Sequence, residues 1–304
     1  SARTRNPPVE KKPFRHLLVV CDLEGSSGCF SKRAAKFLNG DWADACAALT
    51  RDVDAVVTAL FEAGAEAVTV KDFHRTGHNL FTKRIDRRAK IISGYRSGTV
   101  PGMGNLGGID AALFIGLHAS SGSRGFLPHT LTSRIARLTA DGKQVCELQL
   151  FSAALSAENI RPVFFSGCPV ACAEAAKAVR GIRTFAIDKF SRNFNAEAWR
   201  KRLAAEAVRS LAAKTDVYNP QGPFDVAMTF RDGDTAAESF ARSWSMEHRG
   251  PSVSFSAADM RDIYVQLTAK LYAPKALTPF LNLFLPLYNL IGRLGIAWAG
   301  KAAT

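Results

Sequence analysis

Residues 16–28 read HLLVVCDLEGSSG, and this stretch decides the fold. The apolar, β-branched run at residues 16–21 predicts a buried strand, and the Gly- and Ser-rich segment that follows predicts a turn. Apolar side chains then recur at spacings of three and four over residues 42–63, which predicts a helix that ends at Gly64. Residues 67–70 predict the next strand. This order of strand, helix and strand is typical of an α/β protein.

The same alternation continues along the chain. Further strands are predicted at residues 109–115, 145–150 and 162–165, and further helices at residues 197–213 and 259–271. We therefore predict an α/β fold, a three-layer sandwich built on a largely parallel β-sheet. A chain of 304 residues is long enough to bury a sizeable core, as one large or two medium domains.

The chain is basic, with 40 Lys and Arg against 27 Asp and Glu and a formal net charge of +13. Its 47% apolar residues are typical of a folded globular protein. Most of the surplus lies in residues 1–16, with five basic residues and one acidic, and in residues 75–96, with seven basic and one acidic. Neither segment interleaves aromatic and basic residues, and no zinc-finger spacing or RNA-recognition signature is present. We therefore expect no nucleic-acid partner, which leaves a solvated basic face, an anionic membrane surface or an acidic substrate as alternatives.

None of the six cysteines has the two-residue spacing of a zinc knuckle or a redox motif. Those in apolar runs, such as Cys21, are expected to be buried free thiols in a reducing compartment. The N-terminus is polar, contains three prolines within residues 1–13, and lacks the apolar stretch of a signal peptide. We therefore expect a cytoplasmic protein, with peripheral contact at a membrane as an open alternative.

Polar side chains follow the predicted strands at the points where the strands end. Asp22 and Glu24 follow the first strand, His74 follows the second, His118 follows the third, and the fourth carries Glu147. The carboxyl ends of parallel strands lie at one edge of a sheet, and ligands bind there. The sequence therefore predicts that three carboxylates and two imidazoles meet at this edge.

Carboxylate and imidazole groups suit zinc or a similar divalent ion. Five ligands are too many for one tetrahedral site but suit two ions that share a bridging carboxylate. A hydroxide between such ions is a nucleophile at neutral pH, since metal binding lowers the pKa of water to about 7, and it can hydrolyse an amide or an ester. Simpler interpretations remain open for each residue: an Asp after a strand often caps a helix or a turn, a lone His often lies in the core, and Glu147 could be exposed.

Five short motifs resemble those of the bacterial DppA-type family of zinc-dependent D-aminopeptidases, which are binuclear zinc metallopeptidases. The motifs are CDLEG at 21–25, KDFH at 71–74, LFIGLHA at 113–119, PHT at 128–130 and EL at 147–148. The resemblance implies two Zn²⁺ ions per chain. In this interpretation Asp22 bridges the ions, Glu24 and His74 complete the ligands of one, and His118 and Glu147 complete those of the other.

The resemblance also assigns an activity. His129 would be the catalytic acid/base that serves the leaving amine, although the sequence alone is equally compatible with a residue of a Pro-containing turn. Asp72 would orient a ligand histidine. The expected function is a zinc-dependent aminopeptidase or related amide hydrolase that cleaves small peptides, D-amino-acid peptides included. The family assembles as homo-oligomers described as decamers, so we expect a homo-oligomer here.

The residues around the expected ligands depart from the family pattern. Gln149 and Phe151 stand where the family usually has Gly and Asn, and Cys168 and Pro169 follow Gly167 where an acidic residue is usual. We therefore expect metal-dependent hydrolysis, because the expected ligands are present. The altered surroundings argue against a small D-alanyl peptide as the substrate. The alternative is a membrane-associated binding or scaffold protein on a hydrolase fold that has lost activity.

An apolar segment, residues 273–304, continues beyond the resemblance. Prolines and polar residues interrupt it, so we do not expect a membrane span. As a helix it would have one polar stripe, formed by Asn282, Asn289 and Arg293, and its apolar remainder would need cover from the protein, from another subunit or from a membrane surface. The predicted organisation is a flexible arm at 1–13, a metallopeptidase-like catalytic domain at 14–272 and an apolar C-terminal extension at 273–304.

Overall fold

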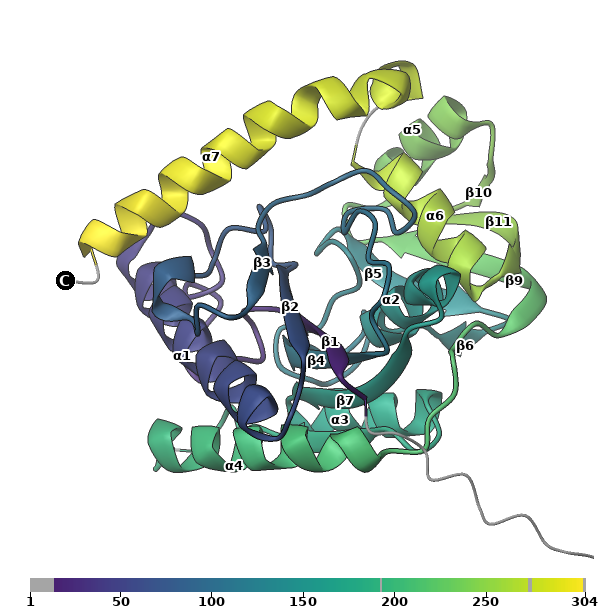
Figure 1. Cartoon of the computed structure of the whole chain (residues 1–304). Helices are drawn as coiled ribbons and strands as arrows, with labels where there is room; N and C mark the ends of the chain where they lie inside the picture. The colour runs from purple at the N-terminus through teal and green to yellow at the C-terminus, as the bar shows by residue number, and fades with distance from the viewer. Residues whose placement is uncertain (1–13, 192, 273–274, 303–304) are drawn as a thin grey trace, which may run out of the picture.

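The structure, a computed structural model, describes residues 14–191, 193–272 and 275–302. The arm predicted at residues 1–13 lies outside the described residues. Figure 1 shows a central sheet with helices on both of its faces and a second sheet to one side. The predicted α/β fold, built in layers around a parallel sheet, is confirmed.

Six strands among the described residues form the parallel sheet, in the spatial order β3-β2-β1-β4-β7-β8. In chain order they are β1 (His16–Cys21), β2 (Ala67–Asp72), β3 (Lys90–Ile92), β4 (Ala111–Leu117), β7 (Arg161–Gly167) and β8 (Arg183–Ala186). At the carboxyl end of β1, Cys21 is in register with Asp72 of β2 and with Ile115 of β4. Three strands therefore end side by side, and the segments that follow them meet.

Both faces of β1 are buried, which explains its continuous apolar run. Leu17 and Val19 face helices α1 (Gly40–Glu62) and α4 (Ala196–Arg209), whereas Leu18 and Val20 face the opposite way. The opposite face is covered by the helices α2 (Glu147–Leu155) and α3 (Pro169–Ala178) and by the second sheet.

The second sheet is antiparallel and was not predicted from the sequence. Its spatial order is β10-β11-β9-β5-β6, with β5 (Ile135–Ala140), β6 (Lys143–Gln144), β9 (Gln221–Phe230), β10 (Glu247–Arg249) and β11 (Ser252–Asp259). Helices α5 (Asp234–Trp244) and α6 (Met260–Leu271) pack against it. Because β9 contains Gly222 and Pro223 near its start and β11 is rich in Ser and Ala, neither strand has the apolar run that marks a strand of the parallel sheet.

The strand predicted at residues 145–150 is wrong. Only Lys143 and Gln144 extend along β5, and helix α2 begins at Glu147. The Gln149 side chain accepts a hydrogen bond from Cys146 N at 3.1 Å and caps the first turn. Nearly every side chain of α2 is buried, and periodicity alone does not distinguish such a helix from a buried strand.

The apolar C-terminal extension forms a short 3₁₀ helix (Lys275–Phe280) followed by α7 (Leu281–Ala302). Helix α7 lies along the outside of the molecule and reaches α1, as Figure 1 shows. Small residues of α7 allow the close approach: an added Cβ at Gly295 would lie 2.2 Å from the ring of Phe37, just before α1, and Ala299 is fully buried. Among the described residues no helix is long and apolar enough to cross a bilayer.

Candidate metal centre

The turn after β1 holds Asp22 and Glu24 at the carboxyl edge of the parallel sheet. Gly25 N donates to Gly116 O at 2.6 Å, which fastens the turn to the end of β4. An added Cβ at Gly25 would lie 2.3 Å from Leu117 O, so glycine is required for this close approach. Both carboxylates are directed inward as a result, and both are almost fully buried.

The loop after β2 holds His74 beside these carboxylates. Asp72 shapes the loop, because its Oδ1 accepts a hydrogen bond from His74 N at 3.1 Å and its Oδ2 accepts one from Asn79 N. Asn79 Nδ2 in turn donates to His74 O at 2.6 Å. Asp72 therefore positions His74 through the backbone, and its carboxylate does not bind the imidazole ring.

Two groups of potential ligands share Asp22. In the first, His74 Nδ1 lies 3.1 Å from Asp22 Oδ1 and 2.9 Å from Glu24 Oε2. In the second, His118 Nε2 lies 3.4 Å from Asp22 Oδ2 and 3.3 Å from Glu147 Oε1. The two oxygens of Asp22 thus face different groups. Ligands about 2.1 Å from a tetrahedral zinc ion lie about 3.4 Å apart, which matches these separations.

One nitrogen of each imidazole faces the carboxylates, and the other makes a hydrogen bond to the backbone. His118 Nδ1 donates to Ala119 O at 3.0 Å, and His74 Nε2 donates to Ala35 O at 3.2 Å. A carbonyl oxygen only accepts, so each of these contacts takes one ring hydrogen, and the nitrogen on the carboxylate side can hold a second proton or bind a metal ion. Among the described residues, buried His118 Nε2 and Glu24 Oε2 have no hydrogen-bond partner. Either a proton on each of these nitrogens or a bound metal ion satisfies the groups that face one another here.

His129 lies at the open side of these groups. Its ring stacks on that of His118, with centroids 3.6 Å apart, and its Nε2 lies 3.9 Å from Glu24 Oε1. Its Nδ1 donates to Leu127 O at 2.9 Å, which directs Nε2 to the site. The His129 side chain is 20% exposed, against 8% or less for the five other side chains.

The pKa values reflect the concentration of negative charge. Burial and the neighbouring Glu24 raise the pKa of Asp22 to about 7. Burial alone would lower the pKa of His118, but Glu147 and Asp22 outweigh it and raise that pKa to about 10. The pKa of His74 is raised in the same way, chiefly by Glu24. The carboxylates therefore attract either protons or metal ions to the imidazoles.

Comparison with known proteins identifies the family. A peptidase family M55 model, described as D-aminopeptidase, matches residues 16–269. The chain belongs to the D-aminopeptidase family. A D-aminopeptidase of Bacillus subtilis (strain 168) is 22% identical over 263 residues, which cover 82% of this chain and 93% of that protein. The predicted resemblance is confirmed, and family membership makes the chain a hydrolase.

A solved structure shares the fold. It is described as the Zn-dependent D-aminopeptidase DppA from Bacillus subtilis, a self-compartmentalizing protease. The TM-score is 0.74 at 20% identity, and the match covers 84% of this chain and 96% of the other. The family match ends at residue 269, within α6, so the 3₁₀ helix and α7 lie beyond it.

The residues that depart from the D-aminopeptidase pattern are engaged in packing. Phe151 is fully buried, with its ring centroid 4.5 Å from that of Phe73. Gln149 caps α2 and its Nε2 donates to Tyr218 Oη at 2.9 Å. Cys168 is buried and accepts a weak hydrogen bond from Phe126 N at 3.5 Å. These positions therefore alter the wall around the site and leave the potential ligands in place.

Sequence reasoning missed the polar residues that support the turn after β1. Asp52 accepts hydrogen bonds from Ser27 N at 2.7 Å and from Arg200 Nε at 2.9 Å. Lys189 is buried and its Nζ donates to the carbonyl oxygens of Ser26 and Cys29. Asp52 and Lys189 belong to α1 and to the segment after β8, and no local pattern in the sequence links either to the turn.

Proposed function

We propose that this chain is a zinc-dependent aminopeptidase that holds two Zn²⁺ ions through Asp22, Glu24, His74, His118 and Glu147. The observation that carries the proposal is the pair of ligand groups joined by Asp22, in which one nitrogen of each imidazole faces buried carboxylate oxygens. Histidines that bind a metal are neutral, so the three carboxylates then leave a negative charge that two divalent ions would compensate. Nitrogen and oxygen donors at these separations fit zinc.

The chain's own groups prepare the reaction. Zinc, when bound at such a site, lowers the pKa of water and polarises a carbonyl oxygen. His129 Nε2 faces the space beside Glu24, and burial together with the neighbouring His118 lowers the pKa of His129. A neutral His129 takes up the proton of the attacking water at Nε2 and returns it to the leaving amine. The hydrogen bond from Nδ1 to Leu127 O keeps the ring in place during both transfers.

We infer that the substrate is a small peptide, D-amino-acid peptides included, and that the enzyme works as a homo-oligomer in the cytoplasm. The self-compartmentalizing relative supports the assembly, and the six buried free cysteines fit a reducing compartment. The set of ligand-type side chains is complete, which favours an active hydrolase over a scaffold that has lost activity.

The test combines metal analysis with a substrate screen. We expect about two zinc ions per chain in the purified protein, loss of activity on chelation, and recovery with zinc. The screen compares D- and L-aminoacyl amides and dipeptides, using the parent and His129→Ala. His129→Ala should retain zinc and lose at least about 100-fold in kcat. A chelated protein that remains active would overturn the proposal, and a zinc-loaded protein that cleaves none of these substrates would favour the scaffold.

A further inference from the structure

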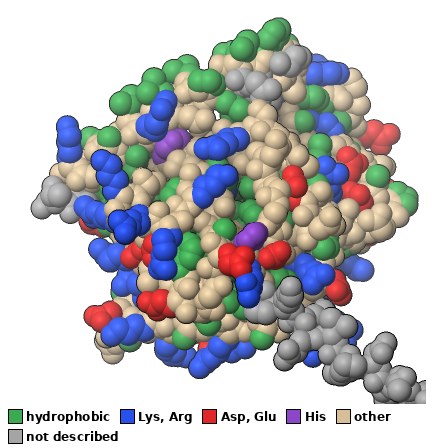
Figure 2. All heavy atoms as spheres, viewed as in Figure 1, with side chains coloured by type: hydrophobic (Ala, Val, Ile, Leu, Met, Phe, Trp, Pro, Cys, Tyr) green, Lys and Arg blue, Asp and Glu red, His purple; other side chains and the backbone are tan. Residues whose placement is uncertain are grey.

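Helix α7 presents an apolar face outward. Leu283, Leu287, Leu290 and Leu294 recur at spacings of four, three and four, so they form one stripe along the helix. Leu283 is 73% exposed and Leu294 is 62% exposed. Figure 2 shows hydrophobic side chains along the upper edge of the molecule, over α7. Contiguous apolar surface of this kind marks an interaction site.

The polar and small residues of α7 face the protein instead. Asn289 Oδ1 accepts a hydrogen bond from Tyr95 N at 3.0 Å, and its Nδ2 donates to Tyr95 O at 3.1 Å. Gly292 packs against His78, where an added Cβ would lie 2.5 Å from Nδ1. A helix that only completes a globular core has the opposite arrangement, with its apolar stripe inward. The fold therefore fixes α7 and leaves its apolar stripe without cover among the described residues.

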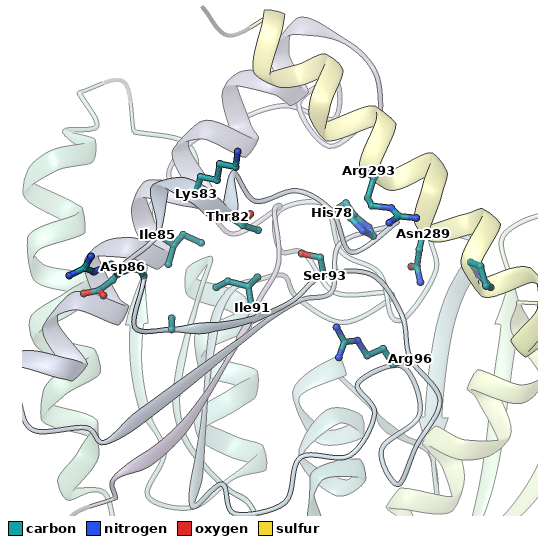
Figure 3. A pocket seen from close by; sticks show the side chains of 13 residues that line it. His78, Thr82, Lys83, Ile85, Asp86, Ile91, Ser93, Arg96, Asn289 and Arg293 are labelled. Carbon is teal, nitrogen blue, oxygen red and sulfur yellow. The ribbon is translucent and has the colours of Figure 1, made fainter.

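A cationic cavity of about 710 Å³ lies beside the same helix. Its lining includes Lys83, Arg87, Arg96 and Arg293, of which Arg293 belongs to α7. None of these four forms an ion pair within the described part of the chain. The carboxylate at its wall, Asp86, is already paired with Arg88 at 2.6 Å. In Figure 3, Arg293 and His78 line the cavity on the α7 side, with Lys83 and Arg96 on other segments.

We propose that α7 and this cavity form one peripheral membrane-binding surface, in which the apolar stripe enters the interface of an anionic bilayer and the cavity accepts a phospholipid phosphate. An apolar helix face flanked by basic side chains is the combination that in-plane membrane helices use. Two copies paired through α7 about a two-fold axis would present the same basic surface to each other, which opposes association. The surface therefore suits an anionic membrane better than a second copy.

Vesicle flotation of the full chain tests the proposal, with phosphatidylcholine vesicles compared with vesicles that also contain phosphatidylglycerol. We expect binding to the anionic vesicles that weakens with salt. Leu287→Glu combined with Leu294→Glu should lose this binding, and Lys83→Glu combined with Arg87→Glu should weaken it by at least about tenfold. All four side chains are exposed and none belongs to the metal centre, so hydrolysis of a small soluble substrate should continue and report intact folding.

Matched controls are Val265→Glu on α6 and Lys177→Glu on α3, both exposed positions outside the surface, and both should bind as the parent does. Equal flotation of the parent and both double variants overturns the proposal. A parent that binds soluble glycerol phosphate but no vesicles also overturns it and assigns the cavity to a free anion. A fall in subunit number on the paired leucine substitutions, without vesicle binding by the parent, overturns it in favour of a second copy.

Discussion

At the scale of single residues, Asp72 shows how a side chain outside the ligand set determines the site. It binds the backbone amides of His74 and Asn79, and so it sets where the imidazole lies. We expect Asp72→Asn to weaken zinc affinity by about 10- to 100-fold, because an amide cannot accept at both positions as the carboxylate does. Competition with a chromogenic chelator measures this. Asp44→Asn, an exposed position on α1, is the control, and equal affinity in the two variants would contradict the interpretation.

Lys71 gives a prediction for pH dependence. It is fully buried, and its Nζ donates to the carbonyl oxygens of Asp72 and Gly94. Burial lowers the pKa of Lys71 to about 8, whereas the unfolded chain holds this proton to about 10.4. The unfolded state therefore binds more protons over this window, and the charged lysine destabilises the fold most below about pH 8.

Urea unfolding of the parent and Lys71→Met at a series of pH values tests this. Relative to Lys71→Met, the parent should gain roughly 2 kcal/mol of unfolding free energy between about pH 8 and about pH 10. The difference between the variants is the relevant quantity, because the cysteine thiols of the unfolded chain also titrate in this range. Lys90→Met, at an exposed position of β3, should show no such gain. A constant difference between the parent and Lys71→Met would show that burial does not lower this pKa.

At the scale of elements, the sequence predicts best where one element is buried on both faces. The run at His16–Cys21 and the periodic helix α1 are recognisable because burial alone selects their residues. The antiparallel sheet is not recognisable from the sequence. Its strands β9 and β11 are only half buried, and their small, polar residues are also typical of loops. The candidate site was predictable because its residues follow strands with a common edge, and Glu147 reaches the same edge from the first turn of α2.

The position of α7 on the protein could not be predicted, because it depends on contacts between small residues of α7 and side chains that are distant in the sequence. Gly292→Ala should destabilise the protein by about 1–3 kcal/mol, since the new Cβ meets His78 and Thr76 in a filled space. Gly300→Ala is the matched control on the same helix: its Cβ would be 3.5 Å from the Phe81 ring, so it should be neutral or stabilising by up to about 1 kcal/mol. Thermal melting measures both. Equal melting temperatures would show that α7 does not depend on this close contact.

At the scale of the whole molecule, the candidate metal centre connects segments that are distant in the sequence. Its side chains come from the ends of β1, β2 and β4 and from the start of α2, which lie within one layered core. Zinc bound there would stabilise the folded state relative to the unfolded chain, because the unfolded chain has no assembled site. Helix α7 supplies no potential ligand, and it touches this connection only at the loop after β2, where Tyr288 Oη donates to Arg75 O at 3.2 Å and Gly292 packs against His78.

Removing zinc should therefore lower the stability of the whole protein and should also loosen some segments more than others. We expect chelation to lower the melting temperature by several degrees and zinc to restore it. Hydrogen exchange should accelerate most in residues 22–29, 73–79 and 118–131, where the loops carry the ligands or contact them, because carboxylates that lose their cations repel one another. Exchange in α7 should change less than in those loops, because α7 carries no ligand and is also held by α1 and by the loop around Tyr95. Faster exchange in α7 with unchanged exchange in those loops would contradict this view, since it would place the stabilising metal away from the edge where β1, β2 and β4 end.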